Sequence, residues 1–274
     1  GVLISHGDGA QLVNCGTIEA IGPNGVGVYL NSGTWSDDYW TVTNGKARQF
    51  DNTGSINAGS NEAIRLAGSI NDITVNFMNG SRVNGHITAE TGSKGALVFG
   101  KKAYADGTAS AELDPEAVMF MHGDISGSSG ITMNVLAGKL TYTGTASVAD
   151  ATVAAGAGLF GNAAYNLPNL TNHGTLSPVV VSSGASGELA INGNLVSDGK
   201  LGVAAYGDNV SKISVSGHAS VAGSKVVMTP GSLYLPGKSY DILEARGAVT
   251  GTIQGGALTG LLDAETASDG SKIT

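Results

Sequence analysis

The chain repeats one short pattern: Asn, any residue, Gly, Ser or Thr, and then an aliphatic residue. It occurs as "VNCGTI" at Val13–Ile18, as "DNTGSI" at Asp51–Ile56 and within "TNHGTLSP" at Thr171–Pro178. The match between the first two copies continues into "VYL" at Val28–Leu30 and "IRL" at Ile64–Leu66. Internal repeats of roughly 20–40 residues, each long enough for two or three strands, indicate a solenoid or a repeat array.

The segments between the turns alternate like short β-strands. Examples are "ITVNF" at Ile73–Phe77, "KLTYTGTASV" at Lys139–Val148 and "ELAINGNLV" at Glu188–Val196. Such alternation places aliphatic side chains on one face and polar side chains on the other. No segment has the period of an amphipathic helix, which a βαβ architecture would need between its strands. The pattern therefore predicts an all-β fold.

The repeated pattern has a physical interpretation if each coil of a β-helix stacks on the previous one. The Asn side chains can then hydrogen-bond along the stack, as in an Asn ladder, and Asn tolerates the left-handed conformation. The Gly is expected to supply the positive φ of a tight corner. The hydroxyl residue is expected to face solvent and the aliphatic residue to face the interior. Because the second position holds Cys15, Thr53 and His173, it is predicted to be exposed.

Composition excludes several other classes. The chain has 43 glycines and only 6 prolines, without a three-residue period, which excludes collagen and argues against disorder. Its net charge is −8 and its few cations are scattered, so no nucleic-acid partner is predicted. Cys15 is the single cysteine, so an intrachain disulfide is impossible. Because the chain starts at Gly1 without a signal peptide, we expect it to be a piece of a longer protein.

The distal half carries a more specific set of motifs: Thr171–Pro178, Ile191–Asn194, Asp208–Gly217 and Gly237–Leu243. In this order they resemble the C-terminal stem of autotransporter passengers, the type V secretion family. Upstream, "AGKLTYTGTASVADATVAAGAGLFG" resembles the strand repeat that often precedes this stem. The chain departs from the family after Pro178, where "VVVSSG" replaces the usual Gly-Asn-Ser.

The resemblance implies a right-handed parallel β-helix, a solenoid, with residues 1–186 forming passenger coils. Residues 187–274 would form a C-terminal cap with an autochaperone role in folding. The partner would be the protein's own C-terminal outer-membrane β-barrel, which this chain lacks. The expected location is the surface of a Gram-negative bacterium, or the medium after export across its outer membrane.

Several motifs have simpler interpretations than catalysis. "GAGLFG" at Gly156–Gly161 matches a dinucleotide fingerprint, but Pro168 interrupts the segment where a helix is required, so a turn is predicted. "GALVFGKK" at Gly95–Lys102 lacks the Ser or Thr that would bind magnesium. β-Helices that cleave polysaccharide use clustered acidic residues on one face. Besides Asp37 and Asp38, the pair Asp114 and Glu116 is the acidic group that comes closest to this pattern. No catalytic residue, cofactor or metal site is predicted. The histidines are expected at solvent-facing corners: His6, His86, His122, His173 and His218.

One segment departs from the repeat, "TWSDDYWTVTNGKARQF" at Thr34–Phe50. Exposed aromatic side chains beside carboxylates often mark contacts with carbohydrate or protein. The candidate ligand contacts are Trp35, Asp37, Asp38 and Tyr39. Asp37 and Asp38 would face opposite ways in a strand, so a catalytic dyad there would need a loop. For Trp40 the preferred interpretation is an ordinary coil strand, with Val42 on the same face.

These observations leave three functional hypotheses. The first is a non-enzymatic stem of an autotransporter passenger that acts in surface display or adhesion, with a host protein or glycan as its ligand. The second is the stalk of an autotransporter enzyme, a subtilisin-like protease or an esterase, whose catalytic domain precedes Gly1. The third is a β-helix that acts on polysaccharide.

Overall fold

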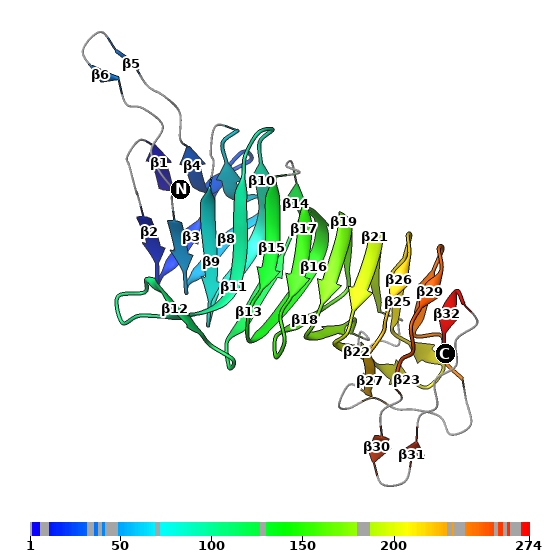
Figure 1. Cartoon of the computed structure of the whole chain (residues 1–274). Helices are drawn as coiled ribbons and strands as arrows, with labels where there is room; N and C mark the ends of the chain where they lie inside the picture. The colour runs from blue at the N-terminus through cyan, green and yellow to red at the C-terminus, as the bar shows by residue number, and fades with distance from the viewer. Residues whose placement is uncertain are drawn as a thin grey trace. The chain divides into compact units, whose positions relative to one another are not determined.

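The computed structural model of the chain is all-β: every regular element among the residues that it describes is a strand (Figure 1). The described residues are 2–5, 11–31, 36–37, 40–41, 49–68, 72–126, 130–179, 187–228, 232, 239–254, 257–259, 262–263 and 270–274. The chain forms two compact units, Gly1–Asp150 and Ala151–Thr274. The expected boundary between residues 186 and 187 concerns a folding role, and it stays a prediction.

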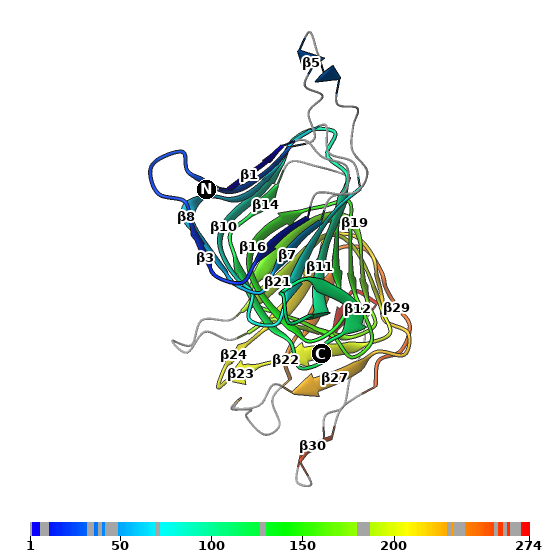
Figure 2. The same cartoon turned by 90° about the vertical axis from the view of Figure 1, so that its left-hand side faces the viewer.

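Unit 1 contains three columns of strands, and within a column each strand pairs in parallel with a strand of the next repeat (Figure 2). The first column consists of β2 (Gln11–Asn14), β7 (Gln49–Asn52), β9 (Ile73–Met78), β11 (Gly95–Ala103) and β15 (Ile131–Val135). The second consists of β3 (Thr17–Glu19), the first halves of β8 (Ser55–Leu66) and β10 (Arg82–Ala89), β13 (Val118–His122) and β16 (Lys139–Ser147). The third consists of β1 (Val2–Ser5), β4 (Val26–Asn31), the second halves of β8 and β10, β14 (Ile125–Ser126) and the end of β16.

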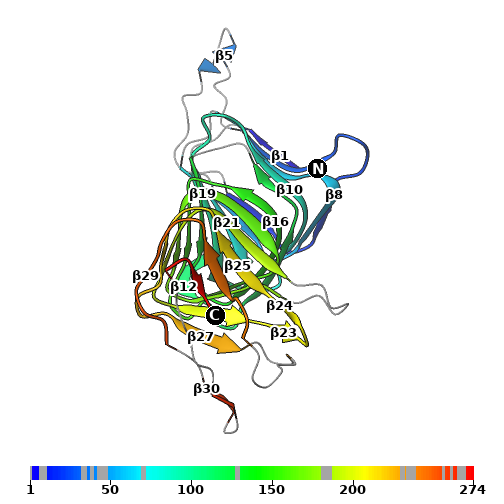
Figure 3. The ribbon, with the colours of Figure 1, turned by 90° about the vertical axis from the view of Figure 1, so that its right-hand side faces the viewer.

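Unit 2 has the same construction (Figure 3). Its first column consists of β17 (Asp150–Val153), the second halves of β19 (Ala163–Asn172) and β21 (Glu188–Ser197), β26 (Ala219–Ser220) and β29 (Val249–Thr250). The second consists of β18 (Gly158–Phe160), β20 (Thr175–Ser177), β22 (Lys200–Val203) and β27 (Lys225–Met228). The third consists of the first halves of β19 and β21, β25 (Lys212–Val215) and β28 (Leu243–Ala245).

A few strands pair antiparallel. In unit 1, β12 (Ala109–Leu113) folds back on β11, and β5 (Ser36–Asp37) pairs antiparallel with β6 (Trp40–Thr41). In unit 2, β32 (Lys272–Ile273) runs antiparallel to β28, so it covers the last edge of the third column. Two further antiparallel pairs in the described part of unit 2 are β23 (Ala205–Tyr206) with β24 (Asn209–Val210), and β30 (Ala257–Thr259) with β31 (Leu262–Asp263).

The register of the strands confirms the repeat. Asn14 pairs with Asn52, and Ile18 pairs with Ile56, so the first two copies of the pattern lie on each other. The Asn14 side chain donates a hydrogen bond to Asn52 Oδ1 at 2.7 Å, and both residues are buried. The ladder expected from the sequence is therefore present between these two corners. Ile56 is fully buried while Cys15 is exposed, as predicted for the last and second positions.

The expected role of the corner glycine was wrong. Gly16, Gly54 and Gly174 do not have a positive φ. A Cβ on Gly54 would instead lie 2.0 Å from the carbonyl oxygen of Gly16, and one on Gly174 would lie 2.3 Å from that of Ala157. Stacked corners approach so closely that only a hydrogen atom fits. Glycine is therefore required at this corner because the repeats are in close contact, and a left-handed backbone is not the reason.

The inward face of each unit is apolar. In unit 1 the interior holds Phe50, Ile56 and Tyr142 with no exposed surface, and the rings of Phe77 and Phe99 stack with centroids 4.8 Å apart. Because β9 and β11 are adjacent in parallel register, equivalent side chains stack from one repeat to the next. Burying each such side chain contributes about 1.5–3 kcal/mol, which is the main stabilising term.

The hairpin of β11 and β12 returns across the outer side of the first column of unit 1 (Figure 2). The backbone N–H of Ala109 donates to the fully buried carboxylate of Asp51 at 3.0 Å, and three amide side chains also donate to it. The amides belong to Gln11, Gln49 and Asn76, at 2.6, 2.7 and 2.6 Å. These donors replace the water that an ionised carboxylate loses on burial. The hairpin is thus anchored to a much earlier repeat.

The tip of this hairpin should be close enough to the first corner for a disulfide. A Cβ built on Gly107 lies 3.9 Å from Cys15 Cβ, within the roughly 3.5–4.5 Å that disulfides span. We expect Gly107→Cys to form a bond with Cys15 under mild oxidation, measured as the loss of both titratable thiols. Gly22→Cys is the matched control, because Gly22 also has a positive φ but has nothing within 4 Å of its Cβ. Two free thiols in Gly107→Cys would contradict this placement of the hairpin.

Candidate functional site

The predicted contact segment is largely outside the described residues. Trp35, Asp38 and Tyr39 lie outside them, and for Asp37 only the backbone is described. Asp37 pairs with Trp40 in the small antiparallel hairpin of β5 and β6. The preferred interpretation of Trp40 as part of an ordinary coil strand was therefore wrong, since among the described residues its strand pairs antiparallel with β5 and joins none of the parallel columns; Val42 lies outside these residues. The four candidate contacts stay a prediction.

The other sequence motifs form turns and strands. Asp114 Oδ1 accepts the backbone N–H of Glu116 at 3.1 Å, so this acidic pair shapes a turn. Residues 95–102 lie within strand β11. In "GAGLFG", Gly156 has φ +84° and the following residues form β18, which confirms the interpretation as a turn. Among the described residues, no group of three or more His, Cys, Asp or Glu is placed to hold a metal ion.

Four of the five histidines are described, and each contacts the next repeat from the surface. His86 Nδ1 accepts the backbone N–H of Asp124 at 3.0 Å, and His218 Nδ1 accepts that of Ala248 at 3.1 Å. His173 Nδ1 lies 2.7 Å from Asp198 Oδ1, and His122 Nδ1 lies 2.7 Å from Thr143 Oγ1. These contacts confirm the corner interpretation for the described histidines. His6 lies outside the described residues.

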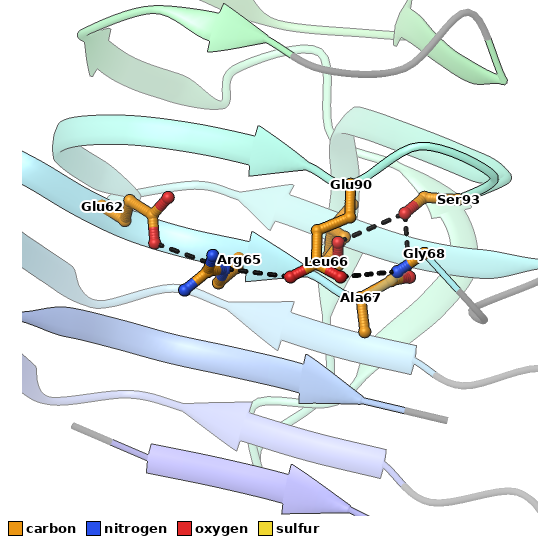
Figure 4. Close-up of polar contacts among 7 residues, drawn as sticks. All are labelled: Glu62, Arg65, Leu66, Ala67, Gly68, Glu90 and Ser93. Carbon is orange, nitrogen blue, oxygen red and sulfur yellow. Dashed lines mark hydrogen bonds and ion pairs between the residues drawn. The ribbon is translucent and has the colours of Figure 1, made fainter. Parts of the chain in front are cut away.

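The charged cluster of Figure 4 is also a link between repeats. Arg65 Nε lies 3.1 Å from Glu90 Oε1 and 3.7 Å from Glu62 Oε2. The other oxygen of Glu90 accepts the backbone N–H of Gly68 at 3.0 Å, and the Ser93 hydroxyl donates to the carbonyl of Ala67 at 2.8 Å. Every charge in this cluster has a partner in the same or the next repeat. We therefore assign a stabilising role to this cluster.

The pKa shifts of Asp106 and Tyr142 have opposite directions and different structural causes. Hydrogen bonds from the backbone and the side chain of Thr108 lower the pKa of Asp106, at the tip of the β11–β12 hairpin. Burial raises the pKa of the Tyr142 phenol, and the nearby Asp124 carboxylate raises it further. Neither group faces the groove described next.

A groove of about 300 Å³ crosses the outward face of the third column in unit 2. Strands β21 and β25 lie side by side there (Figure 3), with β28 next to β25. Leu189, Ile213 and Leu243 point inward and are buried, so the residues that alternate with them point outward. The outward residues that line the groove include Glu188, Asn192, Lys212, Ser214, Glu244 and Arg246.

Most of the polar groups in this groove are already engaged. The Ser214 hydroxyl donates to Glu188 Oε1 at 2.5 Å, and Lys212 Nζ donates to Glu244 Oε2 at 3.0 Å. Arg246 is exposed, and no described residue forms a hydrogen bond or ion pair with its guanidinium. Among the described lining residues the groove therefore presents one free cation, beside hydroxyl, amide and carboxylate groups that each already make one hydrogen bond.

In the groove the Ser214 hydroxyl donates to a carboxylate, and neither Ser214 nor Ser216 has a histidine partner among the lining residues. Sequence reasoning missed the groove. A signal was present, because Glu188, Lys212, Ser214 and Glu244 alternate along their strands with the buried residues Leu189, Ile213 and Leu243. Their alignment across repeats was not deduced.

Comparison with known proteins identifies no relative: no family model, no curated protein and no solved structure matches the chain. No helix among the described residues is long and apolar enough to cross a membrane.

Proposed function

We propose that this chain is part of a right-handed parallel β-helix, the non-enzymatic stem of an autotransporter passenger, exported to the surface of a Gram-negative cell. The stem would display the passenger, and residues 187–274 would promote its folding during secretion. The observation that carries the proposal is the in-register stacking of the corner repeat, with the buried Asn14–Asn52 hydrogen bond as its marker.

The stretch that carries the resemblance supports the proposal in unit 2. Asn172, from "TNHGTLSP", is fully buried and donates to Ser197 Oγ at 3.0 Å. Ser224 Oγ donates in turn to Ser197 Oγ at 2.8 Å, so a polar ladder continues over three successive repeats. Leu176 in the same corner is fully buried. The corner of the resembling motif thus has the same buried Asn and inward aliphatic residue as the first two copies.

Export of the chain tests the proposal. The chain is fused upstream of an autotransporter barrel in a Gram-negative host, and surface exposure is measured by protease accessibility in intact cells. We expect the full chain to reach the surface in a protease-resistant state. We expect a version without residues 187–274 to reach it in smaller amount and to be degraded, because its last repeat exposes apolar surface and unpaired strand edges. Equal export and equal resistance of the two versions would contradict the autochaperone role.

A further inference from the structure

We propose that the groove across β21, β25 and β28 binds a short acidic oligosaccharide, with one sugar carboxylate on the Arg246 guanidinium. The inference does not depend on the autotransporter assignment. It rests on three features of unit 2: the free cation, the course of the groove across three parallel strands and the hydrogen-bonding groups on both sides.

The free cation sets the charge of the ligand. Lys212 is neutralised by Glu244 at 3.0 Å, whereas no described residue neutralises Arg246. A guanidinium presents parallel N–H donors that match the two oxygens of a carboxylate, and such bidentate pairs are among the stronger hydrogen bonds. This differs from Arg65, whose guanidinium is paired with Glu90 within unit 1 (Figure 4).

The strands that line the groove determine the direction in which it runs. Its lining comes from three adjacent parallel strands, with Glu188 and Asn192 on β21, Lys212 and Ser214 on β25 and Glu244 on β28. Adjacent parallel strands are about 4.8 Å apart, and the groove therefore runs across the strands along the stack of repeats. An extended chain of sugars lying along this line would contact one repeat after another.

The hydrogen-bonding groups along the groove determine which other groups the ligand carries. Asn192 donates to Asn166 Oδ1 at 2.7 Å and retains a further N–H and its carbonyl oxygen for a ligand. Ser214, Glu188 and Glu244 add hydroxyl and carboxylate oxygens, which accept hydrogen bonds from sugar hydroxyls. No aromatic residue is among the residues that line the groove, which disfavours an apolar ligand. The two carboxylates also repel a densely charged polyanion, so we infer isolated carboxylates on a hydroxyl-rich chain.

The test uses the full chain and a uronic-acid trisaccharide, with binding measured by titration calorimetry. The comparison ligands are a neutral trisaccharide and a sulfated trisaccharide. We expect the uronic-acid ligand to bind best and its affinity to fall as salt is added. Arg246→Gln should weaken its binding roughly ten- to a hundredfold, the usual effect of losing hydrogen bonds to a charged group. Arg246→Lys should restore part of the affinity.

The matched control is Arg82→Gln, which removes an arginine that stacks on Phe120 in unit 1 and does not line the groove. It should leave the affinity unchanged, and thermal unfolding should show that the Arg246 variants are folded. The assignment is overturned if the uronic-acid ligand does not bind, or if Arg246→Gln binds it as well as the original chain. It is equally overturned if the neutral or the sulfated ligand binds as tightly as the uronic acid. None of these outcomes bears on export.

Discussion

Replacing Leu243 by Asp should largely prevent the chain from refolding. Leu243 is fully buried on β28, where it pairs with Ile213 on one side and with Ile273 of the covering strand β32 on the other. A carboxylate at this position would lose its water without gaining a partner, which costs several kcal/mol. Because the residue lies where β32 covers the column, the cap would also be lost. The measurement is the yield of soluble, protease-resistant protein after dilution from denaturant.

Two variants of unit 1 distinguish a folding role of the C-terminal part from the general cost of placing a charge at a buried position. Leu30→Asp places the same charge at an equally buried site, and Ile18→Asp places it at a half-buried one. A stack of repeats nucleates where local contacts are strongest, and the dense short strands after Gly187 favour the C-terminal end. We therefore expect Leu243→Asp to reduce the yield more than either variant. If Leu30→Asp reduces it as much, the C-terminal part does not lead folding.

Replacing Gly54 by Ala should strongly destabilise unit 1. The added Cβ would lie 2.0 Å from the carbonyl oxygen of Gly16 and 2.9 Å from its nitrogen. Both atoms belong to the backbone, so the two repeats must separate at this corner, where the Asn14–Asn52 hydrogen bond joins them. Overpacking of this kind costs about 1–3 kcal/mol or more. We expect a lower denaturation midpoint for the unfolding of the chain, measured in urea.

The control for this substitution is the same glycine in the first copy of the repeat. A Cβ on Gly16 has nothing within 4 Å, and Gly16 does not have a positive φ. Gly16→Ala should therefore be neutral or stabilise the chain by up to about 1 kcal/mol, because alanine lowers the entropy of the unfolded state. Equal destabilisation by the two substitutions would show that the glycine is required for its own backbone conformation, and that contact between repeats is not the cause.

Much of the fold could be predicted from the sequence because its information is local. The alternation in residues 73–77 and 188–196 predicted strands β9 and β21, and the two copies of the corner aligned Asn14 with Asn52 as the structure does. Exposure of Cys15 followed from the variable residue at its position. Periodicity and the tolerance of a position to different side chains are properties of single segments, and a sequence displays them directly.

The site could not be predicted in the same way. The groove depends on which outward residues of β21, β25 and β28 become neighbours, and the connections between these strands differ in length. Ala190 is paired with Ser214, but the next partner of Ser214, Glu244, follows a longer connection. Arg246 differs from Lys212 because no described residue neutralises its charge. A free cation is a property of its neighbourhood, and sequence spacing does not reveal it.

The sequence by itself determined the all-β class, the repeat, the corner residues and the inward and outward faces of the strands, because each follows from short-range patterns. Only the tertiary structure decided why Gly54 must be glycine, where the β11–β12 hairpin returns to cover Asp51, and which side chains form the groove. These features arise where backbones or side chains from different repeats meet. The physical reason is that a hydrogen bond, a steric contact or a neutralised charge depends on distance in space, which the chain sets only when its repeats are stacked.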